Sequence, residues 1–171
     1  MSAPRLVSGR HAITALVALA LTGGIVFGLG PYHELAAAAP GGELLDTSPR
    51  PDARAFLLEL GPAGRRQYGT VLAFDTIFTL VHGTCLWLLL RFPLQRLQAR
   101  LAHLAWLAAA ATSCDLAENA CIAWLLLDLD ASGSGILPWC TQAKFAALIA
   151  AGSVACLAWT ALALAHLRNR T

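Results

Sequence analysis

The 171-residue chain is 57% hydrophobic and only 13% charged, whereas soluble domains average about 25% charged residues. This composition excludes an ordinary soluble domain and predicts a membrane protein whose first partner is the lipid bilayer. The formal net charge of +2 is too small to indicate nucleic-acid binding, and no basic cluster is interleaved with aromatic residues.

Four apolar runs meet the requirement of about 20 residues for a helix that crosses a bilayer. They cover residues 11–30, 69–91, 101–127 and 141–167. Because short connections force neighbouring spans to be antiparallel, the sequence predicts one all-α membrane domain over residues 1–171, arranged as an up-down four-helix bundle.

The first run has a second interpretation. Arg5 and Arg10 precede an apolar stretch that is followed by small residues at 36–39, which is also the pattern of a secretory signal with a cleavage site. However, the run is longer than the core of about 7 to 15 residues in such signals. Gly24 and Gly28 also have the spacing of helices that pack closely in lipid, so a retained first helix is preferred.

The connection over residues 31–68 begins with proline and glycine and then carries a short helical pattern. A helix is predicted over 53–60, with proline near its first turn and Gly61 at its C-cap. Pro62 then restarts a helix that runs into the second span. Apolar side chains share one face of the short helix, so we expect it to lie on the membrane surface or to cap the bundle. A solvated linker is the alternative.

The other two connections are shorter. Within residues 91–100, Pro93 is expected to mark the turn between the second and third spans. Residues 128–138 contain an Ala-Ser-Gly-Ser-Gly stretch, which is typical of a flexible loop.

Arginine positions predict the orientation. Seven arginines flank the ends of the chain or fill the second connection, against four in the long first connection. This bias places both termini in the cytoplasm of a multi-pass inner-membrane protein. The seven are Arg5, Arg10, Arg91, Arg96, Arg100, Arg168 and Arg170.

Two of the runs hold polar residues that share one helix face. A charged side chain near the centre of a spanning helix costs roughly 2.5–3.5 kcal/mol on insertion scales, so such residues normally face a protein interior or a wet cavity. The spacing is i, i+4 and i+7 in the second run and i, i+3 and i+4 in the third. The residues are Asp75, Thr79 and His82, and Asp115, Glu118 and Asn119.

Depth predicts which of these side chains meet. Counting about 1.5 Å of rise per residue from the midpoint of each run, the two stripes match in level although their helices run in opposite directions. We expect His82 to contact Asp115, and Asp75 to contact Glu118 or Asn119.

Lys144, near the start of the fourth run, has two interpretations. It lies roughly 15 Å from the midplane, so its ammonium group could extend to the interface. Alternatively it turns inward as the counter-ion of Asp75 or Glu118. Three buried carboxylates cannot all stay charged at close range without such compensation.

The combination of carboxylates and histidine suits proton relays and general acid–base sites. The alternative is a hydrogen-bonded clamp between the second and third helices, although such contacts contribute only about 0.6 kcal/mol on average. The catalytic candidates are Asp75, His82, Asp115 and Glu118, and the ligand-binding candidates are Thr79, Asn119 and Lys144.

No cofactor is expected. A haem held by two histidines needs a histidine facing His82 at its own depth, and the sequence provides none. The ligand types would suit iron or manganese, but their spacing is not the Glu-x-x-His repeat of di-iron bundles, so no metal site is assigned. The five cysteines include no Cys-x-x-Cys pair, which indicates packing residues rather than a redox or zinc motif.

Two segments resemble a group of small, uncharacterised bacterial four-span membrane proteins. That group carries a Gly-x-x-Gly-Arg-x-x-Tyr stretch, then an aspartate, and later an Asp-x-x-Glu-Asn motif. The matching positions here are Gly61, Gly64, Arg65, Tyr68, Asp75, Asp115, Glu118, Asn119 and Lys144. The resemblance covers about half the chain. It implies a shared site that adds Arg65 and Tyr68 as ligand-binding candidates, and it implies no activity.

These observations predict a polar pocket that binds a small or lipid-like molecule, with acid–base chemistry as an option. A proton- or cation-coupled transport element, which would need a homodimer, is one alternative. A non-catalytic assembly subunit that pairs its polar residues with a membrane partner is the other. Whether the protein is an enzyme stays open at this point.

Overall fold

The computed structural model describes residues 9–25, 31–47, 52–130 and 135–168. Over these ranges the chain is all-helical, which confirms the predicted fold class at that level. The helices are α1 (Gly9–Gly23), α2 (Pro31–Ala38), the 3-10 helix η2 (Pro40–Gly42), α3 (Ala53–Leu97), the 3-10 helix η3 (Ala99–Ala105), α4 (Trp106–Leu127) and α5 (Leu137–Arg168). The predictions that concern Arg5, Gly28, Arg170 and the loop residues 131–134 fall outside the described ranges.

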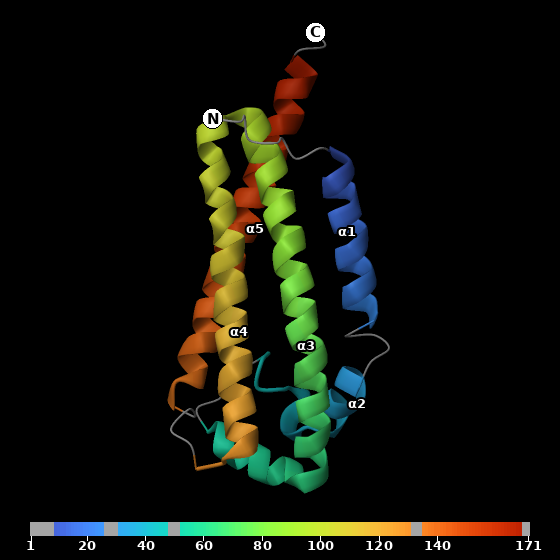
Figure 1. Cartoon of the computed structure of the whole chain (residues 1–171), viewed down its shortest axis with the longest axis vertical. Coiled ribbons are helices and arrows are strands. Elements are labelled where there is room, and N and C mark those ends of the chain that lie inside the picture. Colours follow the sequence, from blue (N-terminus) through green and yellow to red (C-terminus); the bar gives the residue numbers. More distant parts are fainter. Residues whose placement is uncertain (1–8, 26–30, 48–51, 131–134, 169–171) are drawn as a thin grey trace, which may run out of the picture.

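The four longest helices lie along one another. α1, α3, α4 and α5 run lengthwise, and each runs opposite to the one before it (Figure 1). α4 packs on α3 and α5, α3 also packs on α5, and α1 packs on α3. α1 begins and α5 ends at the upper end of Figure 1, whereas α2 and the first turns of α3 lie at the lower end.

Local sequence signals explain how α3 begins and bends. The Asp52 side chain caps the helix by accepting a hydrogen bond of 2.8 Å from the backbone N–H of Ala55. Gly61 has a φ of 71° and interrupts the helix, a conformation that glycine adopts without steric cost. Pro62 then starts the next turn. The predicted short helix, its glycine stop and its restart are therefore confirmed.

The turn after α3 lies later than predicted. Pro93 is inside α3, and the chain leaves the helix at Gln98, whose φ is −162°. Proline has no N–H, so the carbonyl of Leu89 loses its helical partner. The indole N–H of Trp159 on α5 donates to that carbonyl at 3.1 Å. A contact between helices thus allows the helix to continue through the proline.

The long first connection covers the lower end of the helices. It contains α2, which the sequence patterns did not predict, and a turn over residues 44–47 of which residues 44–46 are buried. Leu44 and Leu45 are completely or almost completely buried, and they pack with Leu57 and Ile122 in one apolar cluster. The start of α3 therefore packs against this end of the helices, and the alternative of a solvated linker is wrong for the buried residues 44–46.

Polar residues lie between two apolar core clusters. The lower cluster includes Leu57 and Val71 of α3 and Leu125 of α4. The upper cluster includes Leu90 of α3 and Ala108 of α4. Each long helix that contributes to both clusters carries buried polar side chains in the stretch between them. They are Asp75 and Thr79 on α3, Glu118 and Asn119 on α4, and Thr141 and Lys144 on α5.

Gly83 permits the close approach of α3 and α4. A Cβ atom added there would overlap the hydroxyl oxygen of Thr112 and would lie 3.0 Å from its Cβ. We expect Gly83→Ala to lower the free energy of unfolding by about 1–3 kcal/mol through overpacking, although alanine has the higher helix propensity. Gly152→Ala on α5 is the matched control, because no atom lies within 4 Å of its added Cβ. Thermal unfolding of both variants would test this, and equal midpoints would contradict it.

Candidate functional site

Lys144 is the centre of the buried polar cluster. Its ammonium group forms ion pairs with Glu118 Oε2 and, at 3.3 Å, with Asp115 Oδ1. It also donates a hydrogen bond of 2.7 Å to the backbone carbonyl of Asp46. The residue is only 7% exposed. Of the two predicted placements, the inward one is therefore correct, with Glu118 as the predicted counter-ion.

Glu118 and Thr141 join α4 to α5 beside this lysine. Glu118 is completely buried. Its Oε1 accepts a hydrogen bond from the Thr141 hydroxyl, and its Oε2 faces Lys144. Thr141 and Lys144 are three residues apart on α5, as Asp115 and Glu118 are on α4, so each pair shares a helix face. α4 and α5 therefore contact each other at this level through polar side chains.

The predicted stripes of α3 and α4 also meet. The amide nitrogen of Asn119 donates to Asp75 Oδ2 at 2.8 Å. The hydroxyl of Thr79 donates to Asp115 Oδ2, also at 2.8 Å. The predicted contact between Asp75 and Asn119 is confirmed, and Glu118 turns instead to α5.

Within the described residues His82 forms no hydrogen bond or ion pair with Asp115, although the charge of Asp115 acts on the His82 ring. The His82 ring stacks on Phe78 of its own helix, with centroids 5.6 Å apart and planes 2° apart. Among the described residues, Asp115 has Thr79 on one oxygen and Lys144 on the other. Both carboxylate oxygens of Asp115 are therefore already paired with residues other than His82.

The resemblance-based candidates Arg65 and Tyr68 lie in different surroundings. Tyr68 is almost fully buried, and its hydroxyl accepts from the N–H of Leu45 at 3.0 Å and donates to Asp46 Oδ1 at 3.2 Å. It therefore adjoins the cluster. Arg65 instead donates to the carbonyl of Leu57 at 2.9 Å, across the Gly61 bend of its own helix. This hydrogen bond stabilises the bend, and it does not connect Arg65 to the buried polar cluster around Lys144.

Asp46 and Thr141 are site residues that sequence patterns missed. Asp46 is 7% exposed, and burial raises the pKa of its carboxyl group, an effect that the charge of Lys144 partly opposes. The one available signal was the pair of leucines directly before Asp46, because an apolar pair in a loop indicates an inward turn. Thr141 offered no signal beyond its position three residues before Lys144.

The charges in the cluster do not balance within the described residues. Four carboxyl groups lie in or beside the cluster, and two of them form ion pairs with its single ammonium group. The four belong to Asp46, Asp75, Asp115 and Glu118, and the ammonium group belongs to Lys144. One ammonium can neutralise only one carboxylate, and desolvated like charges repel strongly. Such a centre can hold protons and can pass a proton to a bound molecule.

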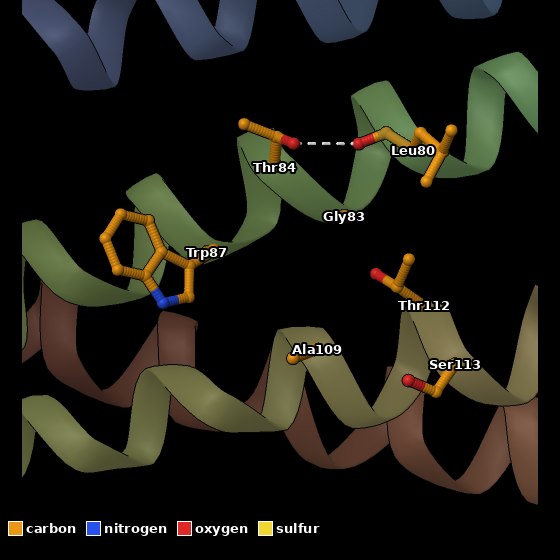
Figure 2. Close-up of a pocket in the computed structure, with 7 residues that line it drawn as sticks. All are labelled: Leu80, Gly83, Thr84, Trp87, Ala109, Thr112 and Ser113. Atoms are coloured by element: carbon orange, nitrogen blue, oxygen red, sulfur yellow. Dashed lines mark hydrogen bonds between the residues drawn. The ribbon is translucent and has the colours of Figure 1, made fainter.

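Two shallow grooves follow the contact between α3 and α4. One has a volume of about 390 Å³ and lies between residues 69–76 of α3 and 116–123 of α4, with Asn119 in its lining. We call it the Asn119 groove. The other has a volume of about 340 Å³ and includes Trp87, Gly83 and Ser113. Figure 2 shows that it is walled by α3 on one side and α4 on the other.

Two threonines in the groove of Figure 2 already donate to backbone carbonyl groups. The hydroxyl of Thr84 donates to the carbonyl of Leu80 at 2.9 Å, and that of Thr112 donates to the carbonyl of Ala108 at 2.8 Å. Both threonines thus satisfy a carbonyl of their own helix. The Asn119 groove differs, because it adjoins the acidic cluster through Asn119 and Asp75.

Fold and cluster together define a helical protein with a buried centre of one lysine and several carboxyl groups. No group of three or more His, Cys, Asp or Glu residues in the described ranges is arranged to hold a metal ion. Comparison with protein-family models, curated proteins and solved structures finds no match. The resemblance to the bacterial four-span group therefore remains a prediction from the motifs.

Proposed function

We propose that this protein is a multi-pass inner-membrane protein whose lysine and acid cluster serves a small or lipid-like molecule that binds beside it. α1, α3, α4 and α5 would form an up-down four-helix bundle. Two of the described helices, α3 and α5, are long and apolar enough to cross a membrane. α4 has 22 residues, which meets the length of about 20 that a spanning helix needs, whereas the described part of α1 has 15.

The apolar exterior supports a lipid environment. Large apolar side chains stay exposed on the long helices, including Ile77 at 61%, Ile149 at 69% and Leu157 at 71%. Contiguous exposed apolar surface is uncommon on soluble monomers. The exposed Trp106 lies at the upper end of α4 and the exposed Trp139 at the lower end of α5, consistent with two interfacial belts.

The proposed orientation follows from the basic residues. Arg91 and Arg96 lie in the last turns of α3, Arg100 lies in η3, and Arg168 ends α5. All belong to the upper end of Figure 1, where α1 also begins. An excess of arginine on one side supports the assignment of that end to the cytoplasm.

The excess of carboxyl groups over ammonium groups carries the functional proposal. A purely structural clamp needs one carboxylate for Lys144, whereas this centre has four acids within reach of each other's charge. Additional acids in an apolar interior raise the cost of folding unless they hold protons. Exchangeable protons at a fixed position are what acid–base chemistry on a bound molecule requires.

Asp75→Asn tests this proposal. The variant removes an exchangeable proton but keeps an oxygen that can accept the hydrogen bond of Asn119, so we expect the thermal midpoint to change little. We expect a lipid or small molecule that co-purifies with the wild type, identified by mass spectrometry, to fall at least tenfold in the variant. Asp130→Asn is the control, because that side chain is 80% exposed.

Two other outcomes would assign a different function. Unchanged co-purification together with a large loss of stability would identify the cluster as a structural clamp. Proton or cation flux in proteoliposomes that Asp75→Asn abolishes would identify a transport element instead.

A further inference from the structure

The Asn119 groove has the size and lining of a site for a hydrocarbon chain. Its volume of about 390 Å³ falls within the range of roughly 300–1,000 Å³ that is typical of ligand pockets. Gly69, Ala73 and Ala120 are exposed along it, so small side chains leave the groove open to the surroundings. No atom lies within 4 Å of a Cβ added at Gly69.

Asn119 lines the groove and carries a buried hydrogen-bond acceptor without a partner among the described residues. The residue is 4% exposed, and within the described part of the chain its Oδ1 has no hydrogen-bond partner. Its amide nitrogen is oriented by Asp75 at 2.8 Å and by the Thr76 hydroxyl oxygen at 3.4 Å. Thr76 cannot also donate to Oδ1, because its hydroxyl donates to the carbonyl of Leu72 at 2.8 Å. A buried amide oxygen without a donor is unfavourable, so a ligand that brings one donor would be favoured.

The acceptors in the groove lining determine the chemistry of the head group. A hydroxyl group has one hydrogen to donate, which matches Asn119 Oδ1, the lining acceptor that has no partner among the described residues. An ammonium group has three, which is more than Asn119 Oδ1 and the Thr76 hydroxyl oxygen can accept, so at least one would be buried without a partner. A carboxylate or phosphate has nothing to donate to Oδ1 and would be desolvated beside an acid-rich cluster.

We propose that the Asn119 groove binds a long-chain alcohol, with the chain along α3 and α4 and the hydroxyl donating to Asn119 Oδ1. Asn119 then connects the alcohol to Asp75, one hydrogen bond away within the acidic cluster. This assignment rests on the proposed function for its lipid environment and names the class of molecule that the site takes.

The test uses the purified full-length protein in detergent and a photoreactive diazirine derivative of hexadecanol. We expect labelling within residues 69–76 and 116–123, located by mass spectrometry. Unlabelled hexadecanol should compete about tenfold better than its methyl ether, which has the same chain but no donor, since one hydrogen bond is worth about a factor of ten. This comparison needs no variant.

Gly69→Leu adds the second arm of the test. The larger side chain would fill the groove, and we expect it to reduce labelling at least tenfold. Gly152→Leu on α5 is the matched control and should label as the wild type does, because its added Cβ also meets no atom within 4 Å. Equal competition by alcohol and ether would overturn the proposal, as would normal labelling of Gly69→Leu. Absent labelling together with a dimer that Gly69→Leu dissociates would show instead that a second copy covers the groove.

The two proposals can fail separately. If alcohol labelling fails but Asp75→Asn still releases the co-purifying molecule, only the assignment of the groove is wrong. If labelling succeeds and Asp75→Asn has no effect on the co-purifying molecule, the groove binds alcohols and the proposed role of the cluster is wrong.

Discussion

Lys144→Met is expected to lower the free energy of unfolding by about 3–5 kcal/mol, because it leaves buried carboxylates without their counter-ion. Glu118 and Asp115 both lose their ion pair with the ammonium group, and the carbonyl of Asp46 loses its donor. Methionine keeps a similar length, so lost packing contributes little. Thermal or denaturant unfolding in detergent would measure the change. The loss should shrink in acid, where protonation removes the uncompensated negative charge.

Arg54→Met is the matched control for Lys144→Met. Arg54 also pairs with an acid, Asp130 at 2.9 Å, but the two side chains are 50% and 80% exposed. Exposed ion pairs contribute only about 0–1 kcal/mol. If the two variants lose a similar free energy of unfolding, burial does not determine how much the Lys144 ion pairs contribute to stability.

Glu118→Leu combined with Lys144→Met is expected to be more stable than the sum of the two single changes predicts. Removing either partner alone leaves a buried charge, whereas replacing both with apolar residues of similar size removes the charges together. We expect a coupling free energy of about 2–3 kcal/mol, at the upper end for residues in direct contact. The remaining Asp115 keeps its hydrogen bond from Thr79.

A second double-mutant cycle, at Arg54 and Asp130, provides the reference for this coupling free energy. Arg54→Met with Asp130→Leu should show a coupling below about 1 kcal/mol, as expected for an exposed pair. Additive effects of the Glu118 and Lys144 changes would show that the two side chains act independently, contrary to their ion pair.

Local chemistry explains which elements could be predicted. The short helix before Gly61 carried its own start and stop signals, Asp52 and glycine, which act within a few residues. The end of α3 did not, because Pro93 normally ends a helix and only Trp159, far along the chain, satisfies the carbonyl that the proline leaves free. Signals that act within one helical turn could therefore be recognised in the sequence. The hydrogen bond between two helices that compensates for Pro93 could not.

The residues of the candidate site could likewise be predicted only in part. Helical spacing was sufficient to place Asp75 with Thr79, and Asp115 with Asn119, on two faces that meet. It could not place Asp46, because nothing in a loop has a fixed period that would indicate its direction. It also assigned His82 to Asp115 by depth alone, and it did not predict that Thr79 and Lys144 pair with the two oxygens of this carboxylate.

The sequence by itself determined the all-α class, the apolar composition and the faces on which the buried acids lie, because helical period and side-chain hydrophobicity are local properties. Only the tertiary structure decided that Lys144 turns inward, that the loop at Asp46 closes over it, and that Asn119 Oδ1, beside a groove, has no partner among the described residues. The physical reason is that pairing of buried charges depends on which helices are neighbours. That choice is made by the packing of the whole chain.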